Sequence, residues 1–471
     1  MSGPSTDPRA VTTGAPMPTR RGTELAMLGF AVVITLAANS IVDLTITGSL
    51  RPDMAAFGAW FAGLWLVVHL VVRKTAPYAD PLLLPSVALL VGLGLAVIHR
   101  LDLAAEQVDS TVTREDAPVQ LVWATLGVVL FVAVLFVLRD HRLLSRFAYT
   151  FALVGLVLLA LPALLPSSIS EVNGAKIWIR LAGFSIQPGE FAKICLIVFF
   201  AAYLVDKRDV LALASRRVMG LELPRGRDLG PVLVAWALSI LVLVFERDLG
   251  SSLLLFGIFM VMLYIATERA SWLLIGLGLF AGGAFLAYQI FGHVQARVDT
   301  WLDPFAYRDG AGYQLVQSLF GLGTGGLFGA GLGGGRPDQV PVAKSDFIAA
   351  AIGEELGLFG LVAVIILYLI LVERGLRTSL IVRDAFGKLL AAGLAFAIAW
   401  QVFVVLGGVT GLLPLTGLTM PFLAYGGSSL VANFVLVAVL VRISDAARRP
   451  AAPAPPPKPA LGEAPTEVVK Q

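Results

Sequence analysis

The stretch VQLVWATLGVVLFVAVLFVL, residues 119–138, contains no charged side chain. A helix needs about 20 mostly apolar residues to cross a bilayer, so this segment alone predicts a transmembrane span. The whole chain agrees with it, because 57% of the 471 residues are hydrophobic and only 14% are charged. Soluble domains average about 45–50% hydrophobic residues and about 25% charged residues. We therefore predict an integral membrane protein, and the formal net charge of +3 gives no reason to expect a nucleic-acid partner.

Similar apolar runs recur on both sides of this stretch. About twelve spans are predicted, since each run has the length that a bilayer requires. They lie near 25–45, 55–72, 81–98, 119–138, 147–166, 187–205, 230–246, 249–267, 271–292, 346–372, 386–411 and 420–441. The expected fold class is all-α, a polytopic membrane protein.

The basic residues give the orientation. If the N-terminus is cytoplasmic and the spans alternate, 24 Lys and Arg fall in inside segments and 10 in outside segments. This excess of basic residues on one side predicts a protein of the cytoplasmic membrane with both termini in the cytoplasm. The ends 1–22 and 446–471 are rich in Pro, Ala or Thr and are expected to be disordered tails.

One outside loop, 293–345, is much longer than usual connections and is therefore expected to be functional. Its segment GLGTGGLFGAGLGGG (321–335) formally matches GxGxxG twice. Because no βαβ unit surrounds the glycines, we reject a dinucleotide-binding interpretation. A flexible or tightly turned loop at the membrane surface is expected, with a backbone cradle for a phosphate or lipid headgroup as the alternative.

Ionisable residues at membrane depth are costly and usually mark function. Glu190 and Lys193 lie three residues apart in an apolar helical run, within pairing reach. They predict either a salt bridge that fixes helix packing or a cavity in which Lys193 meets an anionic lipid headgroup.

Two aspartates stand where outside segments enter spans. Asp248 precedes LGSS and is expected either to cap a helix or to serve the site. Asp346 opens a long apolar helix after the long loop, with Ser345 as a competing cap and Lys344 beside it. Asp346 is the best single candidate for a general base on the outer side.

Other residues carry weaker signals. Trp178 predicts an interfacial belt residue or a loop contact with substrate. The segment LTGLTMPFLAYGGSS (415–429), which ends at Ser429, predicts a broken or re-entrant entry that lines a cavity. The four histidines and Cys195 show no metal-ligand spacing, so no protein metal site is expected.

Taken together, these segments resemble the SEDS family (shape, elongation, division and sporulation). The blocks NGAKIWIRLAGFSIQPGEFAK, FERDLGSS, SDFIAAAIGEELGLFG and LTGLTMPFLAYGGSS follow in that family's order. The likeness covers 81–445 as one glycosyltransferase membrane domain of ten spans, and 23–80 is expected to add two N-terminal spans. The details resemble the elongation branch, RodA, of actinobacteria more than the division branch, FtsW.

The resemblance implies a peptidoglycan glycosyltransferase that polymerises lipid II outside the cytoplasmic membrane during elongation and shape maintenance. The family's essential aspartate maps onto Asp346, its loop tryptophan onto Trp178, and its membrane pair onto Glu190 and Lys193. This sequence departs from the family at Lys344, where His or a small polar residue is usual, and at Ile177.

A mechanism follows as a hypothesis. Asp346 would take the proton of the acceptor hydroxyl, and Lys193, with Arg247 or a divalent cation (Mg²⁺ or Mn²⁺), would stabilise the leaving pyrophosphate. Asp248, Lys344 and Ser429 would complete the headgroup site. The expected partners are lipid II, membrane lipids and a class B penicillin-binding protein for crosslinking.

Three alternatives stay open. A lipid II flippase predicts polar groups in both leaflets, whereas the unusual residues here gather outside. A scaffold that only recruits the transpeptidase predicts that Asp346 is dispensable. A division polymerase of the same family would share the chemistry.

Overall fold

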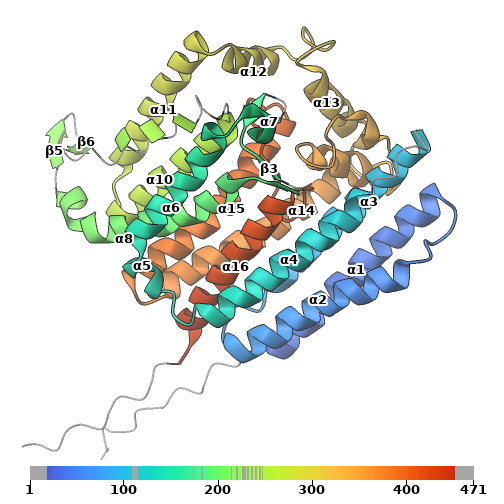
Figure 1. Cartoon of the computed structure of the whole chain (residues 1–471), viewed down its shortest axis with the longest axis horizontal. Coiled ribbons are helices and arrows are strands. Elements are labelled where there is room, and N and C mark those ends of the chain that lie inside the picture. Colours follow the sequence, from blue (N-terminus) through green and yellow to red (C-terminus); the bar gives the residue numbers. More distant parts are fainter. Residues whose placement is uncertain are drawn as a thin grey trace, which may run out of the picture.

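The computed structural model describes residues 19–108, 115–172, 174–181, 184–213, 215–218, 221–224 and 248–450, with 230, 233–234, 237–238, 241–242 and 246 as isolated positions. It is a bundle of long apolar helices (Figure 1). Within the described part, ten helices are long and apolar enough to cross a membrane, and Ala148–Leu164 is a shorter apolar one.

The membrane helices follow each other along the whole chain. They are α1 (Arg21–Ile46), α2 (Met54–Thr75), α3 (Leu83–Val108), α4 (Asp116–Val137), α6 (Ala148–Leu164), α8 (Pro188–Leu213), α10 (Leu249–Thr267), α11 (Ala270–Ile290), α14 (Ile348–Ile381), α15 (Ala385–Val409) and α16 (Gly427–Arg448). The polytopic all-α fold is thereby confirmed. The span expected near 230–246 lies largely outside the described residues, as do the tails.

The remaining elements are short. They are α5 (Leu143–Arg146), α7 (Ser167–Ser170), α12 (Gly292–Leu302), α13 (Tyr313–Gly325), a 3₁₀ turn η2 (Pro337–Gln339), and the strands β1 (Glu171–Val172), β2 (Ala175–Lys176), β3 (Ile179–Leu181), β4 (Phe184–Ile186), β5 (Ser215–Val218) and β6 (Leu221–Pro224). The strands form three antiparallel hairpins, β1–β2, β3–β4 and β5–β6.

The long segment 293–345 is more structured than the sequence predicted. It contains most of α12, all of α13 and η2, and α11, α12 and α13 arch over one end of the bundle (Figure 1). Both α12 and α13 bury one face only, with Val294 and Thr300 buried in the first and Leu315 and Val316 in the second. Such short amphipathic helices have the apolar stripe of a surface helix and fall below the length of a span.

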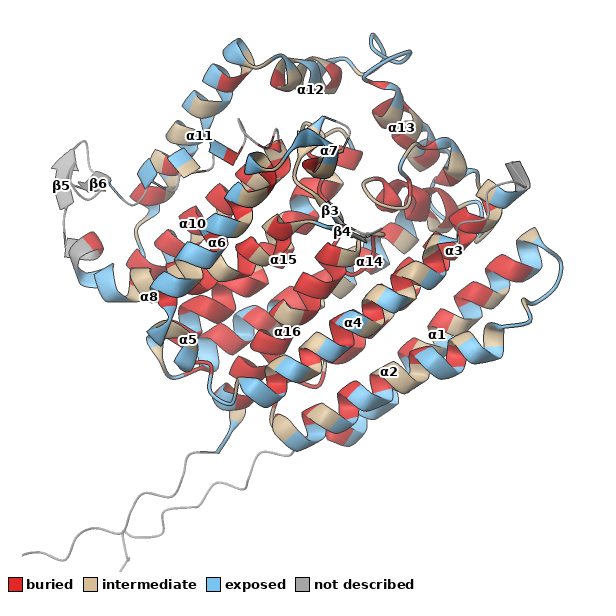
Figure 2. Ribbon diagram, viewed as in Figure 1, coloured by how far each residue is buried: buried red, intermediate tan, exposed pale blue. Residues whose placement is uncertain are grey.

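The most deeply buried membrane helices of the described part are α16, α3 and α15 (Figure 2). In α16, 89% of the most apolar window is buried, compared with 22% in α11. Peripheral helices such as α1, α2 and α11 instead expose apolar side chains, including Phe30, Trp60 and Phe285. In a bilayer these side chains face lipid, so their exposure needs no further protein partner.

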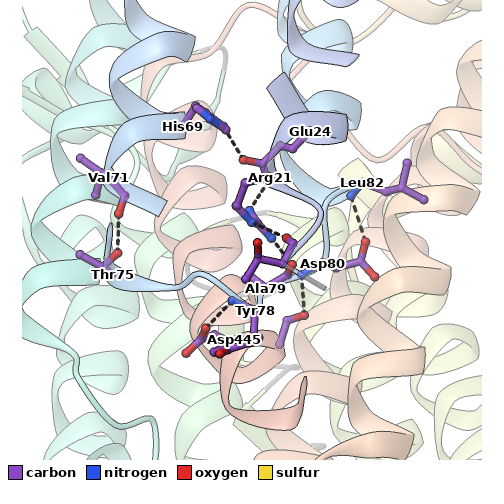
Figure 3. A network of polar contacts seen from close by, with 12 residues as sticks. Arg21, Glu24, His69, Val71, Thr75, Tyr78, Ala79, Asp80, Leu82 and Asp445 are labelled. Carbon is purple, nitrogen blue, oxygen red and sulfur yellow. Dashed lines mark hydrogen bonds and ion pairs between the residues drawn. The ribbon is translucent and has the colours of Figure 1, made fainter. Parts of the chain in front are cut away.

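The two N-terminal helices are fastened to the bundle by buried polar groups. At one end of α1, Arg21 pairs with Glu24 and donates to the carbonyl of Ala79, and Glu24 also bonds to Nδ1 of His69 on α2 at 2.8 Å (Figure 3). Buried charges persist when they are paired and hydrogen-bonded, as these are. The network therefore joins α1, α2 and the loop before α3.

The loop before α3 is in turn bound to the end of α16. The Tyr78 amide donates to Oδ1 of Asp445 at 2.9 Å, and the Asp80 amide donates to Oγ of Ser444 at 3.0 Å (Figure 3). Arg448 also pairs with Asp80. The start of α1 and the end of α16 therefore lie at the same end of the bundle, opposite the arch of α11–α13.

Candidate functional site

The glycine-rich loop is held against a kink in α14. Gly357 has φ 68° and ψ −170°, which interrupts the helix, and its left-handed φ is one that glycine adopts without a steric penalty. The opened backbone bonds to the loop instead, because Ala330 N donates to the carbonyl of Glu354 and Gly331 N to that of Glu355, both at 2.9 Å. Leu358 N donates back to the carbonyl of Gly326.

Buried carboxylates complete this anchoring. Glu354 accepts a bond from Arg336 N at 2.6 Å, and Glu355 pairs with Arg100 of α3 and accepts from Gly333 N. The loop is therefore tightly turned and fixed, and its backbone bonds go to protein groups rather than to an open cradle.

The segment between α15 and α16, residues 410–426, is non-helical, with 420–424 buried and most of the rest partly buried. Irregular backbone at membrane depth requires internal hydrogen-bond partners. Gln401 donates to the carbonyl of Thr419 at 2.9 Å, Gln120 to that of Ala424 at 3.0 Å, and Tyr368 to that of Pro421 at 2.5 Å. The geometry agrees with the predicted re-entrant entry.

Asp346 lies where this segment approaches α12, the start of α10 and the turn before α14. It is half-buried in the turn that precedes α14, and its Oδ2 would be 3.8 Å from a Cβ placed on Gly417. Arg297 of α12 donates to the carbonyl of Leu415 at 2.8 Å. Asp346 therefore stands at the arch end of the bundle, beside the re-entrant segment.

The surroundings of Asp346 raise the pKa of its carboxyl above the usual value. Burial raises the pKa of its carboxyl to about 6, opposed by a hydrogen bond from Ser345 and by the positive charge of Arg297. The negative charge of Asp248 raises it further. A carboxyl with a pKa near neutrality can both take and release a proton at physiological pH, which suits general-base work.

Asp248 caps α10. Its Oδ1 accepts from Ser251 N at 3.1 Å and its Oδ2 from Ser251 Oγ at 2.5 Å. Burial raises the pKa of this carboxyl, and the hydrogen bonds from Ser251 oppose that effect. The capping interpretation is confirmed, and the same side chain acts electrostatically on Asp346. A role for Asp248 in the headgroup site stays a prediction.

Glu190 and Lys193 form a buried pair that reaches the re-entrant segment. Lys193 Nζ lies 2.9 Å from Oε2 of Glu190 and 2.8 Å from Oε1 of Gln401, and Lys193 is 2% exposed. Gln401 in turn donates to the carbonyl of Thr419, which is two residues along the sequence from Gly417. The pair thus supports the backbone that lies beside Asp346.

Lys344 points away from Asp346. Its Nζ lies 2.5 Å from Asp102 of α3 and 2.9 Å from Asp116 of α4, and its carbonyl accepts from Tyr425 N at 2.7 Å. It therefore clamps α3, α4 and the end of the re-entrant segment. A role for Lys344 in headgroup binding stays a prediction.

Ser429 and Trp178 lie on the same side of the bundle. Ser429 is buried in the first turn of α16, where its Oγ accepts from Asn433 at 3.3 Å. Trp178 lies half-buried between β2 and β3, and its amide donates to the carbonyl of Ser170. Contact of either residue with a substrate stays a prediction.

Several residues that build this site are absent from the sequence-based prediction. Arg297, Gln401, Gln120 and Arg100 belong to no motif considered above, although a polar residue within an apolar run is itself a signal. Arg247, the other arginine expected near the pyrophosphate, lies outside the described residues.

The described residues do not offer a protein cage for a metal ion. Among them no group of three or more His, Cys, Asp or Glu side chains is placed to hold one. A requirement for Mg²⁺ or Mn²⁺ stays a prediction.

The fold and the site define a class: a multi-pass helical membrane protein with a re-entrant, carboxylate-bearing site at one end of its bundle. Residues 81–449 match the family described as "Cell cycle protein", which groups FtsW, RodA and SpoVE. The chain belongs to this family.

Its relatives extend the likeness to the whole chain. The chain is 55% identical to the peptidoglycan glycosyltransferase RodA of Mycobacterium tuberculosis over 98% of both chains. It is 37% identical to a probable peptidoglycan glycosyltransferase FtsW of Trichlorobacter lovleyi, over 69% of this chain and 82% of that one. A chain in a solved peptidoglycan synthase complex, in which polymerization and crosslinking are coordinated, superimposes with a TM-score of 0.61 at 26% identity, covering 78% of this chain and 97% of that chain.

Proposed function

We propose that this chain is a peptidoglycan glycosyltransferase that polymerises lipid II at the outer face of the cytoplasmic membrane, in cell elongation. The observation that carries the proposal is Asp346, a half-buried carboxyl with its pKa raised to about 6 and with Arg297 acting on it. The names of the relatives, RodA above all, support the same activity.

In the proposed reaction, Asp346 accepts the proton of the acceptor sugar hydroxyl as the oxygen attacks the anomeric carbon of the donor. The new glycosidic bond forms on one face while the bond to the lipid pyrophosphate breaks on the other, which inverts the anomeric centre. The pyrophosphate leaves with the electron pair of that bond.

Negative charge on the leaving pyrophosphate needs a cation aimed at it. Arg297 is the described cation whose field acts on Asp346, so we assign it this role. Lys193 is already engaged by Glu190 and Gln401, and we propose that it acts by holding the re-entrant segment in place.

Crosslinking requires a second protein in this proposal. The structural relative comes from a complex that coordinates polymerization and crosslinking. We propose a class B penicillin-binding protein as the partner, and a cytoplasmic location for both termini.

The flippase alternative predicts polar groups at both ends of the bundle. The unusual polar residues of the sequence are all expected outside, but the structure adds a buried polar network at the opposite end (Figure 3). The groups of that network pair with one another and join helices, which favours a packing role over a transport path.

The test is to reconstitute the purified chain in liposomes with fluorescent lipid II, with and without a transpeptidase partner. Ladders of glycan chains on a gel would support the proposal. Movement of intact lipid II across the bilayer with no chains formed would contradict it and favour a flippase.

A further inference from the structure

A cavity lined by charged and apolar residues lies at the end of the bundle opposite Asp346. It has a volume of about 320 Å³, and its lining includes Arg20, Asp80, Arg374, Arg448, Met27 and Leu82. Arg20 directly precedes α1 and Met27 lies in its first turns, Leu82 directly precedes α3, Arg374 belongs to α14 and Arg448 ends α16. The cavity thus lies at the seam between the N-terminal helices and the region that matches the family.

The lining has an excess of positive charge. Three guanidinium groups face a single carboxylate, Asp80, whose side chain is fully buried. Arg448 pairs with Asp80, and Arg374 Nη1 lies 3.9 Å from the same oxygen. Glu373, outside the lining, also pairs with Arg374, so two carboxylates stand against three guanidinium groups. Arginine forks match phosphate oxygens in geometry.

The ends of the arginine side chains can be reached from outside. The side chains of Arg374 and Arg448 are 26% and 21% exposed, and Arg20 belongs to the exposed class. The Nε of Arg374 lies 2.8 Å from Oε2 of Glu373. The other nitrogen atoms of this guanidinium group remain available to Asp80 and to the cavity. A phosphate at the mouth would therefore meet guanidinium groups from three different helices.

The apolar part of the lining selects between sources of phosphate. Met27 and Leu82 belong to apolar segments that begin at this end of the bundle. A free phosphate has no use for such a wall, whereas a phospholipid places its acyl chains along it. Basic pockets between transmembrane helices are the type of site that binds acidic lipid headgroups.

We propose that this cavity binds the phosphate of an anionic phospholipid and that the bound lipid fastens α1 to α14 and α16. The site is complete only when the N-terminal helices are present, because Arg20 and Met27 lie before residue 81, where the family match begins. It is distinct from the polymerase site, which lies at the other end of the bundle, and does not depend on the proposed activity.

The test is to strip the purified full-length chain of lipid and titrate it with phosphatidylglycerol, phosphatidylcholine or inorganic phosphate. Native mass spectrometry counts the bound lipid, and the thermal midpoint reports stabilisation. We expect saturable binding of phosphatidylglycerol with a rise in the midpoint. Each basic residue contributes about fivefold to affinity for an acidic lipid, so Arg20→Gln with Arg374→Gln should weaken binding by about 25-fold.

The matched control removes the same charge at the same end of the bundle. Arg73→Gln with Arg383→Gln alters two exposed arginines that do not line the cavity, and binding should be unchanged. If the first double variant fails to fold, Arg20→Gln alone, at an exposed position, should weaken binding by about fivefold.

Three results would overturn the proposal. If phosphatidylcholine bound as well as phosphatidylglycerol, the negative charge of the lipid would play no part in binding. Equal weakening by both double variants would indicate a general surface attraction. Displacement of the lipid by an equal concentration of inorganic phosphate would show that the site takes a soluble phosphate.

Discussion

At the scale of single residues, the proposed reaction depends on how its surroundings set the acidity of Asp346. A general base works best when its pKa lies near the operating pH. Burial provides this shift, and the opposing fields of Arg297 and Asp248 adjust it. The carboxyl is therefore mostly ionised at pH 7 and close to half-protonated at about pH 6.

The first prediction is an acid limb in the pH profile of polymerisation. Because the ionised form accepts the proton, the rate should fall tenfold per pH unit below about pH 6, where Asp346 becomes protonated. Initial rates with labelled lipid II across this range would measure the midpoint. A flat profile through pH 5 would contradict the assignment.

Two substitutions should move that limb in opposite directions. Asp248→Asn removes a negative charge that raises the pKa of Asp346, so the limb should shift to lower pH. Arg297→Gln removes a positive charge that lowers this pKa, so the limb should shift to higher pH. A purely structural role for these residues would change the rate without moving the midpoint.

The buried pair Glu190–Lys193 gives a separate test. Lys193→Met leaves a buried carboxylate without its partner, which should cost about 3–5 kcal/mol of stability. Glu190→Leu combined with Lys193→Met removes both charges and should recover most of that loss. Thermal unfolding in detergent measures both variants.

Activity of the double variant then separates the two roles of the pair. If the pair only supports the re-entrant segment through Gln401, a stable double variant should have a lower kcat with the KM for lipid II unchanged. A raised KM for lipid II in a stable double variant would show that Lys193 takes part in binding the headgroup.

At the scale of elements, the kink of α14 and the glycine-rich loop form one unit. A Cβ on Gly357 would lie 2.3 Å from the amide nitrogen of Gly329, and the φ of 68° is unfavourable for other residues. Gly357→Ala should therefore destabilise the protein by about 1–3 kcal/mol and lower activity by loosening the glycine-rich loop, which precedes the turn that carries Asp346.

The control for Gly357 is a helical glycine of the same segment. Gly323 lies in α13, and nothing lies within 4 Å of the position that a Cβ would take there. Gly323→Ala should be neutral or slightly stabilising, since alanine favours helix by about 1 kcal/mol. Equal thermal midpoints for the two variants would argue against a special role for the kink.

Most of the membrane helices could be predicted from sequence, because length and hydropathy alone set the requirement for a span. The short helices α12 and α13 could not be found by that criterion, since only one face of each is apolar. The re-entrant segment was predictable from Pro421, Gly426 and Gly427, which interrupt an apolar run.

At the scale of the whole molecule, the site joins parts that are far apart in the sequence. Asp346 and Asp248 could be selected individually, but nothing in the sequence pairs Lys344 with Asp102, or Gln120 with the carbonyl of Ala424. Such pairings depend on how the helices are arranged, and local patterns carry no information about that.

The arrangement also predicts a topology. The start of α1 and the end of α16 lie at one end, and the arch of α11–α13 at the other. With Cys195 replaced by Ala, a cysteine at Ser2 should resist an impermeant thiol reagent in intact cells, whereas a cysteine at exposed Asp309 should react. The reverse pattern would place Asp346 on the cytoplasmic side and contradict the proposed function.

The central claim is that Asp346 is the general base at the outer end of the bundle. The most direct test is the rate at which purified Asp346→Asn polymerises labelled lipid II, compared with wild type and with Asp309→Asn, an exposed carboxylate in the same loop. We predict a loss of about 10²–10⁴-fold for Asp346→Asn at unchanged thermal stability, and no loss for the control. Near wild-type polymerisation by a folded Asp346→Asn protein would contradict the claim.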